Sequence, residues 1–352
     1  MSHGVTRIKL RHSVMGQMAR CADRHEHAFR HLRILPSDTR VARHPSRRST
    51  LNGVTESGPP RLRVGIIGAG RVGAVLGAAL RRAGHQVTGV SAVSDLSRLR
   101  AEALLPGVPI VDIPAVTADA DLVLIAIPDD ALAPVVAGLA ETGNVHAGQF
   151  WCHPSGGHGI EILDPATRAG ALPLALHPVM TFTGTSVDLA RLEECPFGVT
   201  APEVLRPVAE ALVVEMGGDP IWVPEENRAL YHAALSYGAN YLITLVAQSL
   251  ELLTTAGIEQ PQRIIAPLLS ASLDNALRLG DHALTGPVAR GDAESVARQL
   301  AAIARVSEQA AVGYQALARV TADRAVASGT LAPHQAAELL GVLGMPAGSG
   351  EA

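Results

Sequence analysis

A glycine-rich segment constrains the fold of this chain more than any other part of it. Residues 64–73 read as an apolar strand that runs into a turn with the pattern G-x-G-x-x-G. Gly68 permits a tight turn, Gly70 lets the backbone approach a pyrophosphate, and Gly73 allows close packing of helix on strand. The Ala- and Leu-rich residues 74–83 predict a helix whose positive N-terminal end faces that phosphate. An ordinary strand–turn–helix unit can hold the same glycines, but this context favours a dinucleotide-binding fold.

The residues expected to contact a dinucleotide lie in this turn and at the ends of the next two strands. They are Gly68, Ala69, Gly70, Arg71, Val72, Gly73, Ser91, Ser94, Arg98, Ile127 and Pro128. An NAD-selective fold usually ends its second strand with Asp or Glu, whereas this one offers Ser91 and Ser94 with Arg98 nearby. Hydroxyls and an arginine suit the 2′-phosphate of NADPH, which we expect as the cofactor, while Asp95 keeps NAD possible.

The strand expected over residues 121–127 is continuously apolar after its first residue, Asp121, which is typical of a buried parallel strand. Its end at Pro128 lies at the ligand edge of an open α/β sheet, where Pro128 would fix the backbone near the ribose or nicotinamide. We expect Asp129 or Asp130 to cap a helix that begins at Ala131.

Two later strand ends carry polar residues that a ligand cleft could use. One is the loop Pro154–Gly159, in which Ser155 and neighbouring N–H groups would bind a carboxylate or amide. The other is His177, which follows the strand 172–176 and is a hydrogen-bond donor or proton carrier, or a histidine satisfied in packing. The spacing of Cys152, His153, His158 and His177 matches no metal motif, so we expect no metal.

The 352 residues are sufficient for two domains. We expect a disordered basic arm at 1–60, a Rossmann domain at 61–224, an all-α domain at 225–345, and a tail at 346–352. The arm is interpreted as a dispensable extension, with a transit peptide or a contact to acidic partners as alternatives. It has no apolar core of a secretory signal.

The composition limits the compartment and the partners. The three cysteines do not pair evenly and show no C-x-x-C spacing, which indicates a reducing, cytoplasmic location without structural zinc. The net charge is −4 although the arm is basic, so the body is acidic, and we expect no nucleic-acid partner.

The second half of the chain has a helical pattern. The first segment, residues 225–256, is apolar but interrupted by polar side chains, so we expect a buried core helix rather than a membrane span. His232, Ser236 and Asn240 are spaced to share one face of it. Buried polar side chains need partners, which either a ligand cleft or helix–helix hydrogen bonds would supply.

Further helices are expected at 262–279, 292–328 (with a break possible) and 333–343. Asp292 is the expected N-cap of the second of these. Thr285, in the turn before it, is a candidate contact for the substrate or nicotinamide, with simple turn chemistry as the alternative.

The order of the motifs GIIGAGRVG, AIPDD, HPSGG, LHPVMTF, YHAALSYGANYL and LTGPVARGD resembles bacterial Rossmann proteins with a helical C-terminal domain. These are similar to pyrroline-5-carboxylate reductase, β-hydroxyacid dehydrogenases and ketopantoate reductase. The resemblance covers residues 61–345 and is nearest to an alternative ketopantoate reductase group. It implies an NADPH-dependent reductase whose all-α C-terminal domain is like that of 6-phosphogluconate dehydrogenase and mediates dimerisation.

The chain departs from this superfamily at one catalytic position. Asn240 matches the asparagine of the first helix of the second domain, but Ser236 stands where a lysine is usual, and Lys9 is the only lysine in the chain. His232 or His177, or water, would then supply the proton.

The resulting hypothesis is reduction of a small 2-oxo acid, with ketopantoate as the first substrate, in pantothenate biosynthesis. Asn240 would hold the substrate, and Ser155, Ser236 and Thr285 would position it. The alternatives are an imine reductase of the pyrroline-carboxylate type and a non-catalytic dinucleotide-binding sensor or scaffold.

Overall fold

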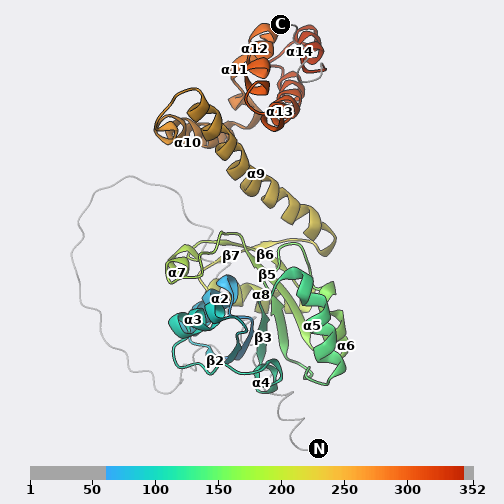
Figure 1. The fold of residues 1–352 in the computed structure, drawn as a ribbon. Coiled ribbons are helices and arrows are strands. Elements are labelled where there is room, and N and C mark those ends of the chain that lie inside the picture. Colours follow the sequence, from blue (N-terminus) through green and yellow to red (C-terminus); the bar gives the residue numbers. More distant parts are fainter. Residues whose placement is uncertain (1–60, 345–352) are drawn as a thin grey trace, which may run out of the picture. The chain divides into compact units, whose positions relative to one another are not determined.

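The chain folds as an α/β domain followed by a helical region (Figure 1). The computed structural model describes residues 61–344. They form two compact units that divide between Ala234 and Leu235. The predicted arm 1–60 and tail 346–352 lie outside the described residues.

The first unit is built on one seven-stranded sheet with the strand order β2-β1-β3-β4-β5-β6-β7. The strands are β1 (Arg63–Ile67), β2 (Gln86–Ser91), β3 (Leu122–Ile125), β4 (Phe150–His153), β5 (Leu172–Pro178), β6 (Pro196–Thr200) and β7 (Asp219–Trp222). Strands β1 to β5 are parallel, β6 is antiparallel to β5, and β7 is parallel to β6. The carboxyl ends of the first five strands therefore meet at one edge, which is the ligand edge of such sheets.

Helices cover both faces of the sheet, which is why its strands are apolar on both sides (Figure 1). On one face pack α2 (Arg71–Arg82), α3 (Asp95–Leu104) and α8 (Arg206–Glu215), with a core that includes Phe197. On the other pack α4 (Ile113–Ala118), α5 (Asp129–Glu141) and α6 (Asp164–Arg168), around Trp151. The remaining short elements of this unit are α7 (Val187–Arg191), η2 (Glu161–Leu163), η3 (Glu203–Leu205) and η4 (Glu225–Asn227).

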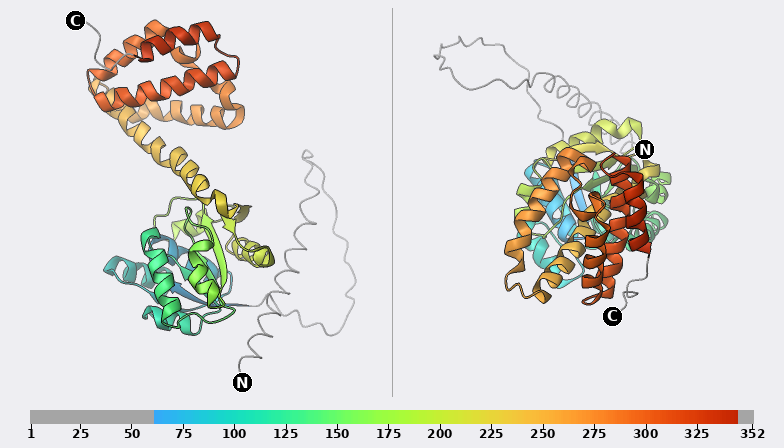
Figure 2. Two further views of the ribbon diagram at one scale, coloured as in Figure 1. Left: turned by 90° about the vertical axis from the view of Figure 1, so that its right-hand side faces the viewer. Right: turned by 90° about the horizontal axis from the view of Figure 1, so that it is seen from above.

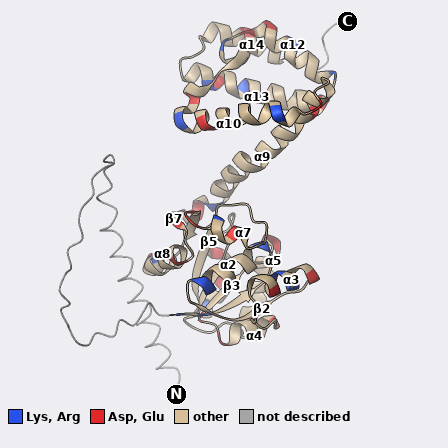
Figure 3. Ribbon diagram, turned by 90° about the vertical axis from the view of Figure 1, so that its left-hand side faces the viewer, with Lys and Arg blue, Asp and Glu red and all other residues tan. Residues whose placement is uncertain are grey.

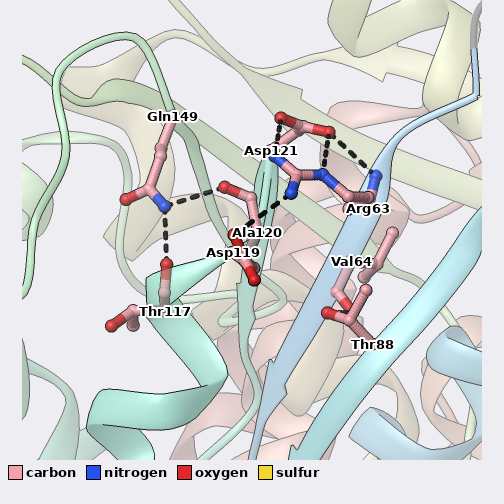
Figure 4. A network of polar contacts seen from close by, with 8 residues as sticks. All are labelled: Arg63, Val64, Thr88, Thr117, Asp119, Ala120, Asp121 and Gln149. Atoms are coloured by element: carbon pink, nitrogen blue, oxygen red, sulfur yellow. Dashed lines mark hydrogen bonds and ion pairs between the residues drawn. The ribbon is translucent and has the colours of Figure 1, made fainter. Parts of the chain in front are cut away.

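A polar network ties the amino ends of the central strands together, opposite the ligand edge (Figure 4). The Arg63 guanidinium donates to both carboxylate oxygens of Asp121, at 3.2 and 3.1 Å. The buried Gln149 amide donates to the carbonyls of Thr117 and Ala120, at 2.7 and 2.8 Å. These bonds fix β1, β3 and β4 at one end and leave the other end for a ligand.

The second unit is entirely helical, as the sequence predicts (Figure 2). It holds most of α9 (Arg228–Thr255), then α10 (Pro261–Leu279), η5 (Gly280–Ala283), α11 (Gly286–Ala289), α12 (Ala293–Ala304), α13 (Glu308–Ala327) and α14 (Pro333–Gly344). Its core comes from α12, α13 and α14, and includes Val296 and Leu339. The predicted helix 292–328 is broken into α12 and α13, because Ser307 caps a new helix with its side chain. Asp292 caps α12 as predicted, accepting from the Ser295 N–H.

The prediction of a buried core helix at 225–256 is wrong for the described chain. Arg228 is the only buried residue of α9, and Pro261 the only one of α10. Helix α9 has few charged residues along its length (Figure 3), namely Arg228 and Glu251. Apolar residues lie around most of its circumference, yet the core of the second unit is built without it. Its exposed large side chains, together with those of α10, are Leu230, Tyr237, Tyr241, Leu242, Ile243, Leu245, Ile264, Leu268, Leu273, Leu277 and Leu279. Within residues 61–344, no helix combines the length and the hydropathy that a membrane span requires.

Candidate functional site

The glycine-rich turn has the geometry that its sequence predicts. Gly68 has a φ of +96°, and an added Cβ would lie 2.5 Å from the Ala126 carbonyl oxygen and 2.9 Å from a methyl group of Ile127. A Cβ on Gly73 would lie 2.0 Å from the Gly68 carbonyl oxygen, so α2 packs directly on the turn. A Cβ on Gly70 would meet only one heavy atom within 4 Å, and no side chain caps α2. The turn therefore leaves an open, uncapped helix N-terminus that fits a pyrophosphate.

Two of the serines predicted to contact the cofactor have structural hydrogen bonds. The Ser91 hydroxyl accepts from the Gly68 N–H at 3.1 Å, which holds the glycine turn against the end of β2. The Ser94 hydroxyl accepts from the Ser97 N–H at 3.2 Å and so caps α3. Their place at the ligand edge is as expected, but both oxygens already have backbone partners.

Three arginines provide positive charge beside this turn. Arg71 begins α2, and Arg98 and Arg100 lie on α3. Among residues 61–344, none of these three side chains has an ion-pair or hydrogen-bond partner, unlike that of Arg63. A Cβ on Gly184 would lie 2.8 Å from Nε of Arg100 and 2.9 Å from Cγ of Arg71, so one backbone position touches both side chains.

The loop after β5 that carries Gly184 is held by a buried carboxylate. Asp188 is fully buried and accepts from the N–H groups of Thr183 and Gly184, at 2.8 and 2.7 Å, and from the Thr183 hydroxyl. Gly184 has a φ of +79°, which glycine adopts without strain. Sequence reasoning missed this loop and Arg100, although the G-T-S-V-D run after a strand end is a turn signal.

The loop Pro154–Gly159 after β4 is fixed at three points. His153 is buried; its Nδ1 accepts from the Ser155 N–H at 3.2 Å and its Nε2–H donates to the Gly159 carbonyl at 2.8 Å. The Ser155 hydroxyl donates to Asp129 at 2.9 Å. The Glu225 carboxylate accepts from the N–H groups of Ile160 and Glu161, at 2.7 and 3.1 Å, just beyond the loop.

Asp129 therefore differs from its expected role. Helix α5 begins at Asp129 rather than Ala131, its N-cap position is Pro128, and no side chain caps it. Asp129 accepts from Ser155 instead, because the loop after β4 lies beside the end of β3. Ile127 and Pro128 lie at the carboxyl end of β3, and Ile127 borders the glycine turn as expected.

His177 forms the centre of a second cluster at the ligand edge. Its Nδ1 lies 2.9 Å from the Tyr231 hydroxyl, and its ring meets that of His232 edge-on, with centroids 5.9 Å apart. A Cβ on Gly156 would lie 2.9 Å from Nε2 of His177 and 2.7 Å from Cδ2 of His232. The two imidazoles thus pack against backbone that only glycine allows.

Arg228 lies behind this cluster and is 2% exposed. Its Nε donates to the Thr200 hydroxyl at 2.7 Å, and its Nη2 donates to the carbonyls of Ala175 and Gly198, at 2.9 and 3.0 Å. Nη1 is the one buried side-chain nitrogen or oxygen of residues 61–344 without a partner. No carboxylate of the described residues forms an ion pair with this buried cation.

Burial and Arg228 together set the protonation of the histidines. Burial lowers the pKa of His177 to about 4, and the charges of Arg228 and His232 act in the same direction. Burial also lowers the pKa of His153 to about 4. Both rings are therefore neutral at pH 7. Burial raises the pKa of the Tyr231 hydroxyl, and Arg228 opposes part of that rise.

The predicted site residues are only partly brought together. His177, His232 and Ser155 lie in the first unit, where His177 and His232 touch. Ser236, Asn240 and Thr285 belong to the second unit, and their roles stay predictions. His232, Ser236 and Asn240 share one face of α9, as their spacing predicts. Thr285 precedes α11 and makes no side-chain cap.

Sequence reasoning missed Tyr231 and Arg228 in the cluster. Both stand in the first turn of α9, and their partners are 54 and 53 residues away in the chain. The signal that could have found them is the run of polar residues at the start of an otherwise apolar helix. Residues 61–344 hold no group of three or more His, Cys, Asp or Glu side chains arranged for a metal ion.

This architecture defines a Rossmann-like α/β domain followed by a largely helical region, and comparisons with known proteins agree. Residues 45–178 match the family model of a Rossmann-like domain, and residues 195–321 match a domain of unknown function, DUF2520. The chain thus combines a Rossmann-like domain with a DUF2520 domain. No curated protein matches the sequence.

Several solved structures share the fold at low sequence identity. A proposed NADP oxidoreductase from Bacteroides fragilis is 21% identical with a TM-score of 0.63, covering 75% of this chain and 98% of its own. A protein from Thermotoga maritima is 22% identical with a TM-score of 0.56, covering 75% and 99%. An imine reductase from Myxococcus stipitatus, solved with NADP+, is 15% identical with a TM-score of 0.57, covering 74% and 94%.

Proposed function

We propose that this protein is an NADPH-dependent reductase of a small carbonyl compound. The observation that carries the proposal is the pair of His177 and Tyr231 at the carboxyl end of β5, on the same sheet edge as an open glycine turn. Strands β1 and β5 are three strand spacings apart, about 14 Å, a span that an extended dinucleotide crosses. A dinucleotide bound at the turn would bring its nicotinamide toward this pair.

The residues at the turn fit NADPH as the cofactor. The uncapped N-terminus of α2 would receive the pyrophosphate. Arg71, Arg98 and Arg100, which lack carboxylate partners, would receive the 2′-phosphate, because arginine binds phosphate through several N–H donors. When bound, the reduced nicotinamide supplies the hydride. The proposed NADP oxidoreductase from Bacteroides fragilis has the same fold.

The polar residues of the edge would handle the substrate. His177 would donate a hydrogen bond to the substrate oxygen through Nε2, which has no hydrogen-bond partner among the described residues. Nε2 is also open to a ligand, because Arg228 Nη1 is the only buried side-chain nitrogen or oxygen of residues 61–344 without a partner. His232 would flank it, and Ser155 would help to position the substrate. For three residues of the second unit we keep the roles proposed from the sequence: Asn240 would hold the substrate oxygen or carboxylate, and Ser236 and Thr285 would position the substrate.

The charge of the site favours a 2-oxo acid over an imine. Arg228 is a buried cation without an ion pair in the described chain, and such a charge attracts a carboxylate and a developing alkoxide but repels an iminium. Ketopantoate is therefore the first substrate proposed, which would place the protein in pantothenate biosynthesis in the cytoplasm. Cyclic imines are the second class, because imine reductases share the fold. A sensor without turnover is the third possibility.

The test is the oxidation of NADPH, followed by absorbance, with ketopantoate and pyrroline-5-carboxylate in parallel and NADH as the competing cofactor. We expect oxidation with NADPH and ketopantoate. Turnover of the cyclic imine alone would mean that the substrate is an imine and not a 2-oxo acid. Tight NADPH binding without turnover of either compound would favour the sensor. Failure to bind either cofactor would contradict the whole proposal.

We also propose that α9 and α10 mediate a homodimer. A helix that is apolar around most of its circumference, as α9 is, is normally buried, yet α9 and α10 together expose many large Leu, Ile and Tyr side chains. A second copy of the chain would remove that apolar surface from water.

A further inference from the structure

The position of the Tyr231 side chain depends on a glycine, Gly198, in the neighbouring strand β6. A Cβ on Gly198 in β6 would lie 2.3 Å from the Tyr231 hydroxyl oxygen and 2.7 Å from Cζ. The hydroxyl occupies that space and lies 2.9 Å from Nδ1 of His177. Glycine at position 198 thus makes room for a hydrogen bond between two elements that are far apart in the chain.

The hydrogen bond has a direction. Burial raises the pKa of the Tyr231 hydroxyl and lowers that of His177, so a phenol faces a neutral imidazole at pH 7. An imidazole nitrogen is the better acceptor and a phenol the better donor, so Tyr231 donates to Nδ1. The ring proton of His177 is then on Nε2.

Arg228 stands where a negative charge on Tyr231 would be stabilised. Its guanidinium carbon is 5.8 Å from the centre of the Tyr231 ring, and its three hydrogen bonds all go to neutral oxygens. A buried cation with one orphaned nitrogen and no ion pair is unfavourable unless a negative charge forms nearby. A phenolate at Tyr231 would be that charge.

We propose that Tyr231 is the proton source of the reaction and that it acts through His177 while Arg228 stabilises the phenolate. This inference rests on the proposed reductase function. Sequence reasoning assigned the proton to His232, His177 or water, but a neutral imidazole that only lost its proton would become an unfavourable anion. Proton transfer from Tyr231 through His177, a proton relay, avoids that species.

The step balances as follows. As hydride reaches the carbonyl carbon, the C=O π electron pair moves to oxygen. The oxygen takes the Nε2 proton of His177, while Nδ1 takes the hydroxyl proton of Tyr231. His177 ends as the other neutral tautomer and Tyr231 as a phenolate, which water reprotonates after product release. In this scheme Tyr231 is a positioning residue for proton supply, because only His177 touches the substrate.

Several charged or titratable groups face this pair and contribute to its titration. They are His232 and Arg228 from α9, Asp129 from α5, and Cys195 before β6, with Glu225 and Cys152 facing Arg228. The Asp129 charge favours protonated His177, whereas Arg228 and His232 oppose it. The relay therefore depends on Arg228 outweighing Asp129.

The first experiment reads the hydrogen bond without turnover. NMR of the full chain with 15N-labelled histidine should show His177 neutral at pH 7 with its proton on Nε2. Tyr231→Phe should shift that tautomer balance. A His177 proton on Nδ1 in the unaltered protein would overturn the relay, because Tyr231 would then be the acceptor.

The second experiment measures rates with NADPH and the accepted substrate. Tyr231→Phe should lower kcat about 100-fold or more, with the Kd of NADPH changed less than about twofold. Tyr314→Phe is the matched control: it also removes one hydroxyl hydrogen bond, to Gln299 at 2.7 Å, but on α13. Undiminished kcat in Tyr231→Phe would overturn the relay alone, whereas no turnover by the unaltered protein would contradict the proposed function and the relay together.

The third experiment tests the cation by ultraviolet titration of the phenol. Arg228→Gln should move Tyr231 ionisation to higher pH and lower kcat, and Arg228→Lys should restore part of both. Thermal melts identify Arg228 variants that fail to fold. If neither variant folds, the kcat of Tyr231→Phe decides whether the relay operates. An unchanged titration in folded Arg228→Gln would overturn the role of Arg228.

Discussion

Single side chains at the ligand edge are held by contacts that leave little freedom. His153 uses both ring nitrogens on the backbone of its own loop. Gly156 lacks the Cβ that would strike His177 and His232. Because neither role involves a ligand, these residues are part of the framework that positions the reacting groups, and both can be tested separately from the chemistry.

Acid should destabilise the protein through His153. Its pKa is about 4 in the folded chain and 6.5 as the ordinary value, so the unfolded chain binds more protons between these pH values. Stability is then fully present above pH 6.5 and falls as the pH drops toward 4, by about 3 kcal/mol for this group. Urea unfolding at pH 7 and pH 4.5 measures it. His153→Gln should show a smaller fall, and an equal fall would contradict the assignment.

Gly156→Ala should slow turnover strongly without weakening the binding of the cofactor. The new methyl group would push His177 and His232 apart, and we expect kcat to fall about 100-fold, with NADPH affinity unchanged. Gly138→Ala on α5 is the control, since its Cβ would meet nothing within 4 Å. Equal rates in the two variants would mean that the imidazole cluster does not contribute to the reaction.

At the scale of elements, the two loops that follow β4 and β5 shape the edge of the sheet. The first loop borders the imidazole cluster, and the second brings Gly184 against Arg71 and Arg100. Each is fixed by a carboxylate that accepts backbone N–H groups: Glu225 for the first and Asp188 for the second. The cofactor end and the chemical end of the site are thus built by separate loops.

Gly184→Ala should reduce the preference for NADPH over NADH about tenfold. The methyl group would displace Arg71 and Arg100, and a lost charged hydrogen bond to the 2′-phosphate has an effect of this size. Gly143→Ala carries a similar positive φ, +73°, with nothing within 4 Å, so it isolates backbone strain from the arginines. Fluorescence titration with both cofactors is the measurement. A ratio that Gly184→Ala leaves unchanged would exclude these arginines from 2′-phosphate recognition.

The sequence was sufficient for features that depend on neighbouring residues and insufficient for those that depend on distant ones. Gly68, Gly73 and the Asp292 cap follow from local pattern, and the structure confirms each. The pairing of His177 with Tyr231, 54 residues apart, depends on how β5 and α9 pack, which no local pattern contains. The burial predicted for α9 was wrong because apolar composition does not say which surface covers a helix.

At the scale of the whole molecule, apolar surface on α9 and α10 is the main unexplained feature of the chain taken alone. Ile243 is 71% exposed and Leu277 is 79% exposed. Side chains of this size each gain about 1.5–3 kcal/mol when fully buried. Association of two copies through these helices would supply that burial.

Size-exclusion chromatography with light scattering should therefore find a dimer. Ile243→Glu or Leu277→Glu should shift it toward monomer, because each would place a charge in the apolar contact. Val204→Glu, at a residue 75% exposed in η3, is the control and should stay dimeric. A monomeric unaltered protein would contradict the dimer proposal.

The outer strand β7 limits how two copies of the chain can associate. Asp219, and Val223 just after the strand, donate their N–H groups inward to the carbonyls of Cys195 and Val199, at 2.9 Å each. The alternate residues Pro220 and Trp222 then face the free side, and proline has no N–H to offer. This free side is a poor template for another strand, which protects the sheet from edge-to-edge aggregation.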